Sequence, residues 1–328
     1  MMIKNLAISN FKSIKELQMK PQRINLLIGE PNSGKSNLLE VLGLLSAWGY
    51  DPSILSDFVR FQNISNLFYD DLTENSIIMR INHITFSLRY EYDVFILQES
   101  SSKGEARFNH NGEYAGGSST GHFITEILPL LKAIKFYRFK NLIQFQSKMR
   151  EFLLPPNGSN LFSVIYGNNA HRSLIQQMVK DFGFSLVFKP QDLNFEIQKQ
   201  VNDTIILYPY IVTSNTLRHM IFYMFAINSN KDSILVFEEP EGHVFPYYTK
   251  LLAEKIALDT RNQYFIATHN PYFLTSILAK APKATTNTFV TYFEDYQTKL
   301  TSLSSSEVED ILDSEKDPFF NISSFYKM

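Results

Sequence analysis

The sequence contains a short segment whose residue types suit the binding of phosphate groups. Residues 29–37, GEPNSGKSN, fit the pattern Gly-x-x-x-x-Gly-Lys-Ser/Thr. In such a loop, successive backbone N–H groups and the positive end of the following helix face phosphate oxygens. Lys35 would reach the β- and γ-phosphates of a nucleotide, and Ser36 would ligate Mg²⁺. The residues predicted to bind the nucleotide are Gly29, Asn32, Ser33, Gly34, Lys35, Ser36 and Asn37.

An acidic pair follows an apolar run later in the chain. The run SILVF at 233–237 leads directly into Glu238 and Glu239, within EEPEGHVFP. Beside a phosphate loop, one such carboxylate holds the magnesium ion and the next polarises the attacking water. We therefore predict that Glu238 is a metal ligand and that Glu239 is the catalytic base. The alternative, a solvated acidic turn after a core strand, does not account for the phosphate loop in the same chain.

A histidine ends a third apolar run, QYFIATHN at 263–270. At the end of a strand, His269 can hydrogen-bond the γ-phosphate or the attacking water, and we predict a catalytic role for it. A structural role for this histidine is the alternative. The other six histidines show no metal-ligand spacing and the chain has no cysteine. No metal besides the Mg²⁺ of the nucleotide is therefore expected.

The hydrophobic pattern predicts the elements that must hold these residues. Buried strands are expected at 2–10, 23–29, 233–237, 263–268 and 288–293, and alternating antiparallel strands at 76–98 and 184–209. Helices are expected at 35–48, 161–180, 215–228, 248–259 and 305–314. Residues 109–122 are expected to form a hairpin tip or a disordered connection, and residues 123–153 helix and strand. The strand, loop and helix around the phosphate-binding pattern are the context that this motif requires.

The composition narrows the class of protein. The 328 residues carry 31 basic and 33 acidic side chains, so the net charge of −2 does not indicate a nucleic-acid binder. An apolar fraction of 44% is ample for a core, and the absence of cysteine excludes disulfides. The sequence has no run of about 18 apolar residues and no signal-peptide pattern. We therefore expect a cytoplasmic protein that has no membrane partner.

The order of these motifs resembles that of one known family. The chain is similar to ABC-type ATPases of the RecF, SMC and OLD (overcoming lysogenization defect) group, a set of AAA-type ATPases. It resembles their small stand-alone form, as found in bacterial anti-phage defence systems. The segments that carry the resemblance are ISNFKSIKEL, NGSNLFSVI, FEEPEGHVFP and IATHNPYFL. The resemblance implies that the chain hydrolyses ATP to ADP and phosphate with Mg²⁺.

The resemblance also implies an architecture. The fold class would be α/β, a P-loop NTPase of ABC-ATPase head type, with a mixed central sheet, an antiparallel β subdomain and a helical signature subdomain. More than half of the chain separates Lys35 from Glu239, so an insertion is expected between the motifs. We predict one composite head over residues 1–328. Its parts would be a nucleotide-binding core at 1–100 and 230–300, an inserted helical and strand region at 101–229 that ends in the signature helix, and a C-terminal extension at 301–328.

The family pattern implies a signature segment before the acidic motif. In the family, a serine-led helix N-terminus docks on the γ-phosphate bound by the other protomer. The segment TSNTLRHMIFYMFAI at 213–227 would place Ser214 and Asn215 in that position. The alternative is an ordinary helix cap, in which Ser214 or Thr216 caps a core helix.

Two residues depart from the family pattern, and two more are assigned from it. The usual signature glycine is Asn215 here, which tolerates left-handed backbone angles better than most residues. The usual magnesium aspartate is Glu238, one methylene longer, and both changes bear on the hydrolysis rate. Lys12 would lie near the nucleotide, with a surface lysine at a strand end as the alternative. Gln62 is the candidate Q-loop ligand of the metal.

Three functions remain open at this stage. The first is a nucleotide-gated clamp, a head-to-head dimer or higher homo-oligomer, that controls a separate nuclease or toxin effector in anti-phage defence. The absence of a long heptad region, and the expectation that the residues after His269 only complete the head, favour a separate effector. The second is a RecF-like DNA-repair ATPase, for which the basic stretch at 131–150 would bind DNA instead of forming a solvated face. The third is an ATP-binding assembly scaffold with little turnover.

Overall fold

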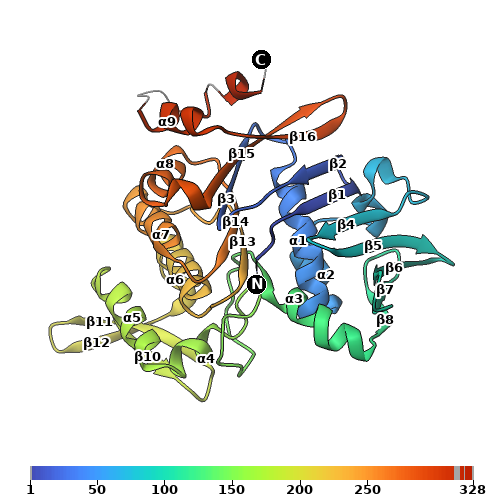
Figure 1. Ribbon diagram of the computed structural model, residues 1–328. Helices are drawn as coiled ribbons and strands as arrows, with labels where there is room; N and C mark the ends of the chain where they lie inside the picture. Colours follow the sequence, from blue (N-terminus) through green and yellow to red (C-terminus); the bar gives the residue numbers. More distant parts are fainter. Residues whose placement is uncertain (1, 314–317, 321, 327–328) are drawn as a thin grey trace.

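The computed structural model describes residues 2–313, 318–320 and 322–326 and contains three β-sheets in this range (Figure 1). The largest sheet has seven antiparallel strands in the order β2-β1-β4-β5-β6-β7-β8. The central sheet has six strands in the order β16-β15-β3-β14-β13-β9. A three-stranded antiparallel sheet, β10-β11-β12, lies at the lower left of Figure 1. The mixed central sheet and the antiparallel β subdomain expected from the sequence are confirmed.

The elements have the following bounds. The strands of the seven-stranded sheet are β1 (Leu6–Phe11), β2 (Ile14–Met19), β4 (Ile77–Ile81), β5 (Ile84–Glu91), β6 (Val94–Glu99), β7 (Glu105–Phe108) and β8 (Tyr114–Ser118). The strands of the central sheet are β3 (Ile24–Gly29), β9 (Ile134–Tyr137), β13 (Ile234–Glu238), β14 (Gln263–Ala267), β15 (Thr286–Glu294) and β16 (Gln297–Ser302). The small sheet comprises β10 (Ser185–Lys189), β11 (Asn194–Val201) and β12 (Thr204–Pro209). The α-helices are α1 (Lys35–Tyr50), α2 (Leu55–Phe58), α3 (Leu128–Ala133), α4 (Leu161–Tyr166), α5 (Asn169–Lys180), α6 (Asn215–Asn228), α7 (Pro246–Leu258), α8 (Pro271–Lys280) and α9 (Ser305–Asp313).

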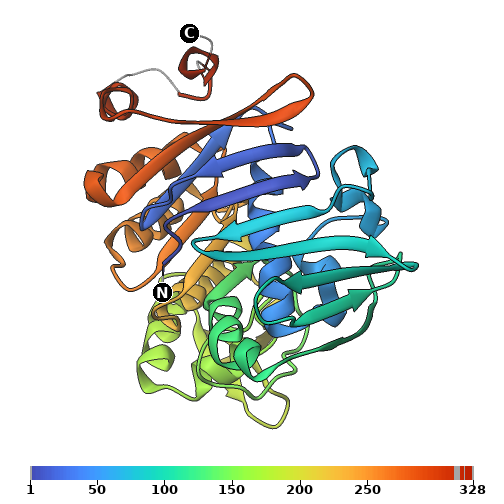
Figure 2. The ribbon, with the colours of Figure 1, turned by 45° about the vertical axis from the view of Figure 1, so that its right-hand side comes forward.

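Helix α1 lies between the two larger sheets (Figures 1 and 2). One core cluster joins α1 to the seven-stranded sheet and to one face of the central sheet. Every residue from 38 to 47 is therefore buried, whichever side of the helix it occupies. Helices α6, α7 and α8 contribute to the second core cluster, on the opposite face of the central sheet. The strands β3 and β14 are buried along their whole length, as expected for parallel strands covered on both faces.

The register of the central sheet brings distant residues together. Strands β9, β13, β14, β3 and β15 are mutually parallel, and only β16 runs antiparallel to its neighbour β15. Ala267 at the end of β14 is paired with Glu238 on one side and with Leu27 on the other, while Phe237 is paired with Tyr137. The residues that follow β3, β14, β13 and β9 therefore emerge at one edge of the sheet. In open α/β sheets, ligands bind at this carboxyl edge.

Several predictions about local structure are confirmed, and others are wrong. Residues 76–98 form three antiparallel strands and residues 184–209 form another three, as their alternation indicated. Residues 109–113 form the expected hairpin turn, but 114–118 form the edge strand β8 instead of a loop. Residues 123–153 contain a π-helical turn, α3 and β9, and then no regular element after residue 137.

Two further differences have local causes. The helix expected at 161–180 is broken into α4 and α5, because the Asn168 side chain accepts the backbone N–H of Ala170 at 2.8 Å and starts a new helix. Strand β16 was missed, although Asp295 and Tyr296 both have positive φ and form a tight turn after β15. Position 314 of the predicted terminal helix lies outside the described residues.

The predicted division of the chain into core and insertion remains a prediction. The segment assigned to the insertion contains β7 and β8, which continue the seven-stranded sheet, and β9, which is a strand of the central sheet. The region around the signature helix contains the small sheet β10-β11-β12 as well as helices α4, α5 and α6.

Candidate functional site

The phosphate-binding pattern forms a tight loop between β3 and α1. Gly34 has φ 95° and precedes α1, and a Cβ there would lie 2.0 Å from the side-chain oxygen of Thr298. A Cβ on Gly29 would lie 2.3 Å from the backbone oxygen of Thr291. Both glycines are therefore required by the packing of the loop against β15 and β16. Asn32 also has a positive φ of 61°, in the middle of the loop.

Lys35 folds back over this loop. Its Nζ donates hydrogen bonds to the carbonyl oxygens of Gly29 at 2.9 Å and Glu30 at 2.8 Å. The neighbouring Ser33 hydroxyl is bonded to Thr291 Oγ1 at 2.6 Å, which fixes the loop to β15. Burial lowers the pKa of Lys35 to about 8, against the opposing charges of Glu239 and Glu30. An anionic phosphate would raise the pKa of this ammonium group again and so favour its charged form.

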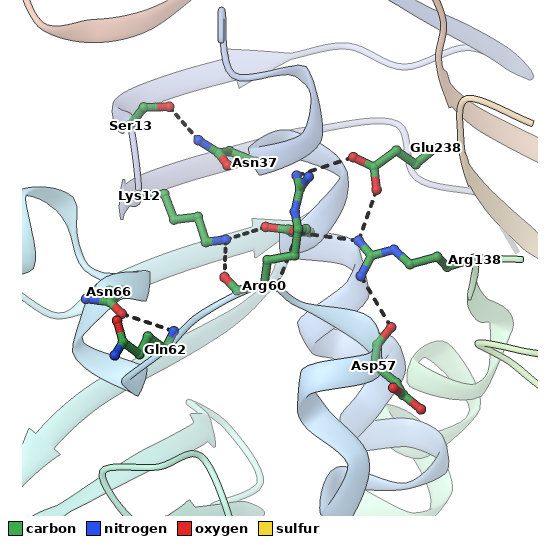
Figure 3. Close-up of polar contacts among 10 residues, drawn as sticks. Lys12, Ser13, Asn37, Asp57, Arg60, Gln62, Asn66, Arg138 and Glu238 are labelled. Carbon is green, nitrogen blue, oxygen red and sulfur yellow. Dashed lines mark hydrogen bonds and ion pairs between the residues drawn. The ribbon is translucent and has the colours of Figure 1, made fainter. Parts of the chain in front are cut away.

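Ser36 and Glu238 meet beside the loop. The Ser36 hydroxyl lies beside the Glu238 carboxylate and helps to lower its pKa. Arg138 Nη2 contacts the other side of this carboxylate, with 3.0 Å to Oε2, and Arg60 Nη2 lies 3.3 Å from Oε1 (Figure 3). Burial raises the pKa of Glu238, but the Ser36 hydroxyl and the two arginines lower it by more, so it lies below its ordinary value. A hydroxyl and a carboxylate in contact fit the two protein ligands that Mg²⁺ takes when phosphates and water complete its shell.

A second carboxylate, Glu40, is fully buried and contacts the same arginines. It lies on α1 with no exposed side-chain area, and Arg60 Nε donates to its Oε1 at 2.7 Å. Arg138 Nη2 lies 3.5 Å from the same oxygen, and Lys12 Nζ contacts Oε2. Burial lowers the pKa of Lys12 even though Glu40 opposes the shift. Three cations and two carboxylates thus form one network, which we call the arginine–glutamate cluster (Lys12, Glu40, Arg60, Arg138 and Glu238).

Glu239 and His269 form the adjoining pair. His269 Nε2 lies 3.4 Å from Glu239 Oε1, and the side chains are 38% and 53% exposed respectively. Glu239 has φ 44°, and its backbone N–H donates to Ala267 O at 2.9 Å, so the backbone turns out of the sheet immediately after β13. Burial and the charge of Lys35 lower the pKa of His269, and Glu239 offsets part of this shift. A neutral imidazole beside a half-exposed carboxylate can accept or relay a proton from water.

The proposed signature residues begin α6. Ser214 caps the helix, and its hydroxyl accepts the N–H of Leu217 at 3.2 Å. Asn215 is the first helical residue and does not adopt the left-handed angles considered from the sequence. Its side chain instead accepts a hydrogen bond from Arg218 at 2.5 Å. The cap is thus present, and docking of Ser214 on a phosphate of a second protomer remains a prediction.

Two predicted residues, Gln62 and Asn37, lie further from Glu238. Gln62 is exposed, and its backbone N–H donates to Asn66 Oδ1 at 3.2 Å, away from Glu238 in Figure 3. Arg60, two residues earlier, makes the contact with Glu238 instead. Asn37 donates to the Ser13 hydroxyl at 2.7 Å and so joins α1 to the β1–β2 turn. The roles of Gln62 and Asn37 in binding stay predictions.

Sequence reasoning did not find Glu40 or Arg60, and it treated Arg138 only as part of a basic stretch. Arg138 follows the segment IKFY at 134–137, in which Lys135 interrupts the apolar run, so the signal that identified Glu238 is weaker here. The basic stretch itself is not a continuous charged surface, because Lys135 is buried over the ring of Phe152 and Arg138 is paired with Glu238. Burial lowers the pKa of Lys135 to about 7. The observation that favoured DNA binding is therefore weakened.

The comparisons with known proteins agree with this geometry. Residues 1–151 match the family model described as AAA ATPase domain. Over 93–95% of its length the chain has the fold of SMC heads. The chain is an ATPase that resembles the RecF and SMC-like ABC group. No curated protein matches the sequence of this ATPase.

Two solved structures illustrate the likeness of the fold. One is an SMC head bound to the C-terminal winged-helix domain of ScpA, with 17% identity and a TM-score of 0.53, over 93% of this ATPase and 99% of the other chain. The other is an SMC head with an extended coiled coil, bound to the C-terminal domain of ScpA derived from Pyrococcus furiosus. It has 16% identity and a TM-score of 0.52, over 95% of this ATPase and 98% of the other chain. Among the residues that the model describes, no helix of this ATPase has the length and apolarity to cross a membrane.

Proposed function

We propose that this ATPase binds ATP and Mg²⁺ at the phosphate loop and hydrolyses ATP between two protomers, as a clamp that controls a separate effector. The observation that carries the proposal is the meeting of Lys35, Ser36, Glu238, Glu239 and His269 at the carboxyl edge of one sheet. These are the group types that phosphoryl transfer needs: a cation, two magnesium ligands, a base and a hydrogen-bonding partner for the base.

Each of these residues would have a separate role in the reaction. Lys35 would leave the loop carbonyls and bind phosphate oxygens, which satisfy its ammonium group better than neutral carbonyls do. Ser36 and Glu238 would hold the Mg²⁺, which neutralises phosphate charge when it is bound. Glu239 would accept the proton of the attacking water, and His269 would orient that water or the γ-phosphate.

The arginine–glutamate cluster bears on the rate of this reaction. Glu238 is engaged by Arg60 and Arg138, so the carboxylate must exchange at least part of these ion pairs when it ligates a metal ion. Because the arginines compete with the metal ion for Glu238, we expect slow ATP turnover. The second candidate function is therefore a scaffold that binds ATP and rarely hydrolyses it. The two candidates differ in the measured rate of phosphate release and not in the binding site.

A protein partner is supported by the small sheet. The edge strand β12 exposes Ile205 by 59% and Leu207 by 48%, together with Ile206 and Tyr208. An apolar edge strand of this kind is usually covered by another chain, because its unpaired backbone groups invite strand pairing. The strand leads through a single turn to Ser214, so nucleotide-dependent docking at the signature helix would reach a partner bound there. We propose an effector protein, a nuclease or toxin, as the partner.

The binding claim is tested with Lys35→Ala, and Lys250→Ala on the exposed side of α7 serves as the matched control. We expect Lys35→Ala to weaken ATP binding at least about 100-fold, as measured by titration calorimetry, because a buried charge-assisted contact is lost. The control should bind as the wild type does. Equal affinities in both variants would contradict the site.

The clamp claim is tested at Ser214. Ser214→Asp keeps a good helix cap but places a negative charge where the phosphate of the second protomer would dock. We expect normal thermal stability and normal ATP binding, together with loss of the ATP-dependent dimer in light scattering. Dimerisation equal to that of the wild type would leave Ser214 with its capping role alone.

A further inference from the structure

Glu241 is a buried acidic residue three positions beyond Glu238, in the loop between β13 and α7. The residue is 5% exposed, and its Oε1 accepts a hydrogen bond from the hydroxyl of Thr268, which is fully buried. The second carboxylate oxygen of Glu241, Oε2, has no hydrogen-bond partner among the described residues. Glu241 therefore reaches from the loop that carries Glu239 to the strand end that carries His269.

Thr268 makes this link more than a single contact. Its hydroxyl donates to Glu241 and accepts the backbone N–H of Asn270 at 3.0 Å, and its own N–H donates to Leu27 O at 3.2 Å. Asn270 in turn caps α8 by accepting the N–H of Phe273 at 3.0 Å. The Glu241–Thr268 bond thus connects the catalytic loop with the strand β3 below the phosphate loop and with the start of α8.

Glu239 and His269 lie at the surface of the site, and the contact between them does not by itself fix their relative positions. Glu239 and His269 are substantially exposed, and the 3.4 Å contact between them is a long one. Besides that contact and the Glu239–Ala267 backbone bond, the Glu241–Thr268 bond joins these two segments in the described part of the chain. An error of about 1 Å in such a pair is enough to cost a large factor in rate.

We propose that Glu241 is a positioning residue that fixes the segment of His269 against the loop of Glu239, and that its ionised form does so best. The inference deepens the proposed hydrolytic function and rests on it. A carboxylate is a stronger acceptor than a neutral acid for the Thr268 hydroxyl, which gives the ionised form its advantage. Among the charged and titratable groups, Glu239 faces Glu241 from the same loop, His269 from the end of β14 and Tyr223 from α6. Burial raises the pKa of Glu241 to about 7, with a smaller contribution from Glu239, so the two forms interconvert in the range where the enzyme can be assayed.

The experiment compares Glu241→Ala, Glu241→Gln and Thr268→Val with the exposed control Glu74→Gln. For each purified protein, ATP affinity is measured by calorimetry, and kcat by phosphate release between pH 6 and 8.5. We expect Glu241→Ala and Thr268→Val to lose at least about tenfold in kcat while the Kd for ATP changes by less than about twofold. Glu241→Gln keeps an acceptor for Thr268, so it should retain more activity than Glu241→Ala. We expect the kcat of the wild type to rise near pH 7, and this rise should be absent from the profile of Glu241→Gln.

The outcomes separate this inference from the proposed function. The double variant Glu241→Ala/Thr268→Val should be no slower than the slower single variant, because both changes break one link. Wild-type kcat in Glu241→Ala would overturn the positioning role and leave the ATPase site intact. A structural role would give a different pattern. Glu241→Ala would then lower the Tm and weaken ATP binding as much as it lowers kcat, and Glu241→Gln would match the wild type at every pH. This result would show that the proposal is wrong. A wild-type protein that does not bind ATP would overturn both proposals.

Discussion

Glu238, at the end of β13, and Glu241, in the loop that follows, have pKa values that shift in opposite directions. Burial raises the pKa of both side chains. At Glu238 the hydroxyl of Ser36 and the charges of Arg60 and Arg138 reverse this effect, and the pKa falls below its ordinary value. At Glu241 the opposing contacts are hydrogen bonds from Thr268 and the backbone, and the pKa stays high, at about 7. The cations around a carboxylate, and not its depth, decide its charge here.

The difference matches the two tasks that we propose. A carboxylate that ligates a divalent cation must be ionised at every working pH, and the arginine–glutamate cluster keeps Glu238 in that state. A carboxylate that positions other groups needs acceptor oxygens and can titrate without leaving its place. The following predictions test this comparison from its largest expected effect to its smallest.

The largest effect is expected at Glu40. Glu40→Leu removes a buried carboxylate that contacts Lys12, Arg60 and Arg138, and leaves three cations with Glu238 as their one acidic partner in the cluster. Breaking a buried ion pair from one side typically costs about 3–5 kcal/mol, so the free energy of unfolding should fall by about 4 kcal/mol in urea denaturation. The exposed control Glu74→Leu should change it by less than about 0.5 kcal/mol. Equal losses in the two variants would show that the cluster does not stabilise the fold.

The next effect is a pH dependence at Glu241. A folded-state pKa raised from 4.5 to about 7 favours the folded protein fully below pH 4.5, and this contribution is lost as the pH rises through about 7. Gln cannot ionise, so the free energy of unfolding of Glu241→Gln, relative to that of the wild type, should rise by about 3 kcal/mol between pH 4.5 and pH 8. Urea denaturation at several pH values measures this difference. A difference that stays constant with pH would mean that Glu241 titrates normally.

Glu238 should show the opposite slope. Its lowered pKa stabilises the folded protein above pH 4.5, and this contribution is lost as the pH falls through the folded-state pKa. Glu238→Gln should therefore be less stable than the wild type at pH 7, and this deficit should shrink toward pH 4. The same denaturation series checks it. If the free energies of unfolding of the variants at 238 and 241, relative to the wild type, change with pH in the same direction, the distinction between the two carboxylates is wrong.

The smallest effect is expected at Arg60. Its side chain is 56% exposed, so its ion pairs are screened by water, and Arg60→Ala should cost about 1 kcal/mol or less. Arg138 is only half as exposed and bonds the same carboxylate at 3.0 Å, so Arg138→Ala should cost more. The two free energies of unfolding are compared at pH 7. If Arg60→Ala lowers the free energy of unfolding by more than Arg138→Ala does, the exposed Arg60 is the more important ion-pair partner of Glu238.

The sequence predicts the phosphate loop and the two catalytic strand ends because each is a local pattern. An apolar run that ends in a polar residue is visible in the chain, and parallel strands then bring Glu239 and His269 to one edge. The arginine–glutamate cluster was not predicted because it depends on register. Arg138 meets Glu238 only because β9 pairs with β13, about a hundred residues further along the chain, and Glu40 meets both arginines only because α1 lies beneath them.

Lys135 and Glu241 were also not understood from the sequence, because their partners are distant in the chain. Lys135 looked like a surface cation in a basic stretch, yet it lies in a strand that is buried on both faces and bonds Asn230. Glu241 stood in the acidic motif without an assigned role, because its partner Thr268 belongs to the neighbouring strand. Chemistry that depends on residues consecutive in sequence could be read directly, and chemistry that depends on strand pairing required the fold.

The clamp is tested most directly by the mass of the Glu239→Gln protein in solution, with and without ATP and Mg²⁺. This variant keeps Lys35, Ser36 and Glu238 but lacks the proposed base, so it should bind ATP and not release phosphate. The account predicts a monomer without nucleotide and a stable dimer with ATP and Mg²⁺, by mass photometry. A mass that does not change although ATP is bound would contradict the clamp.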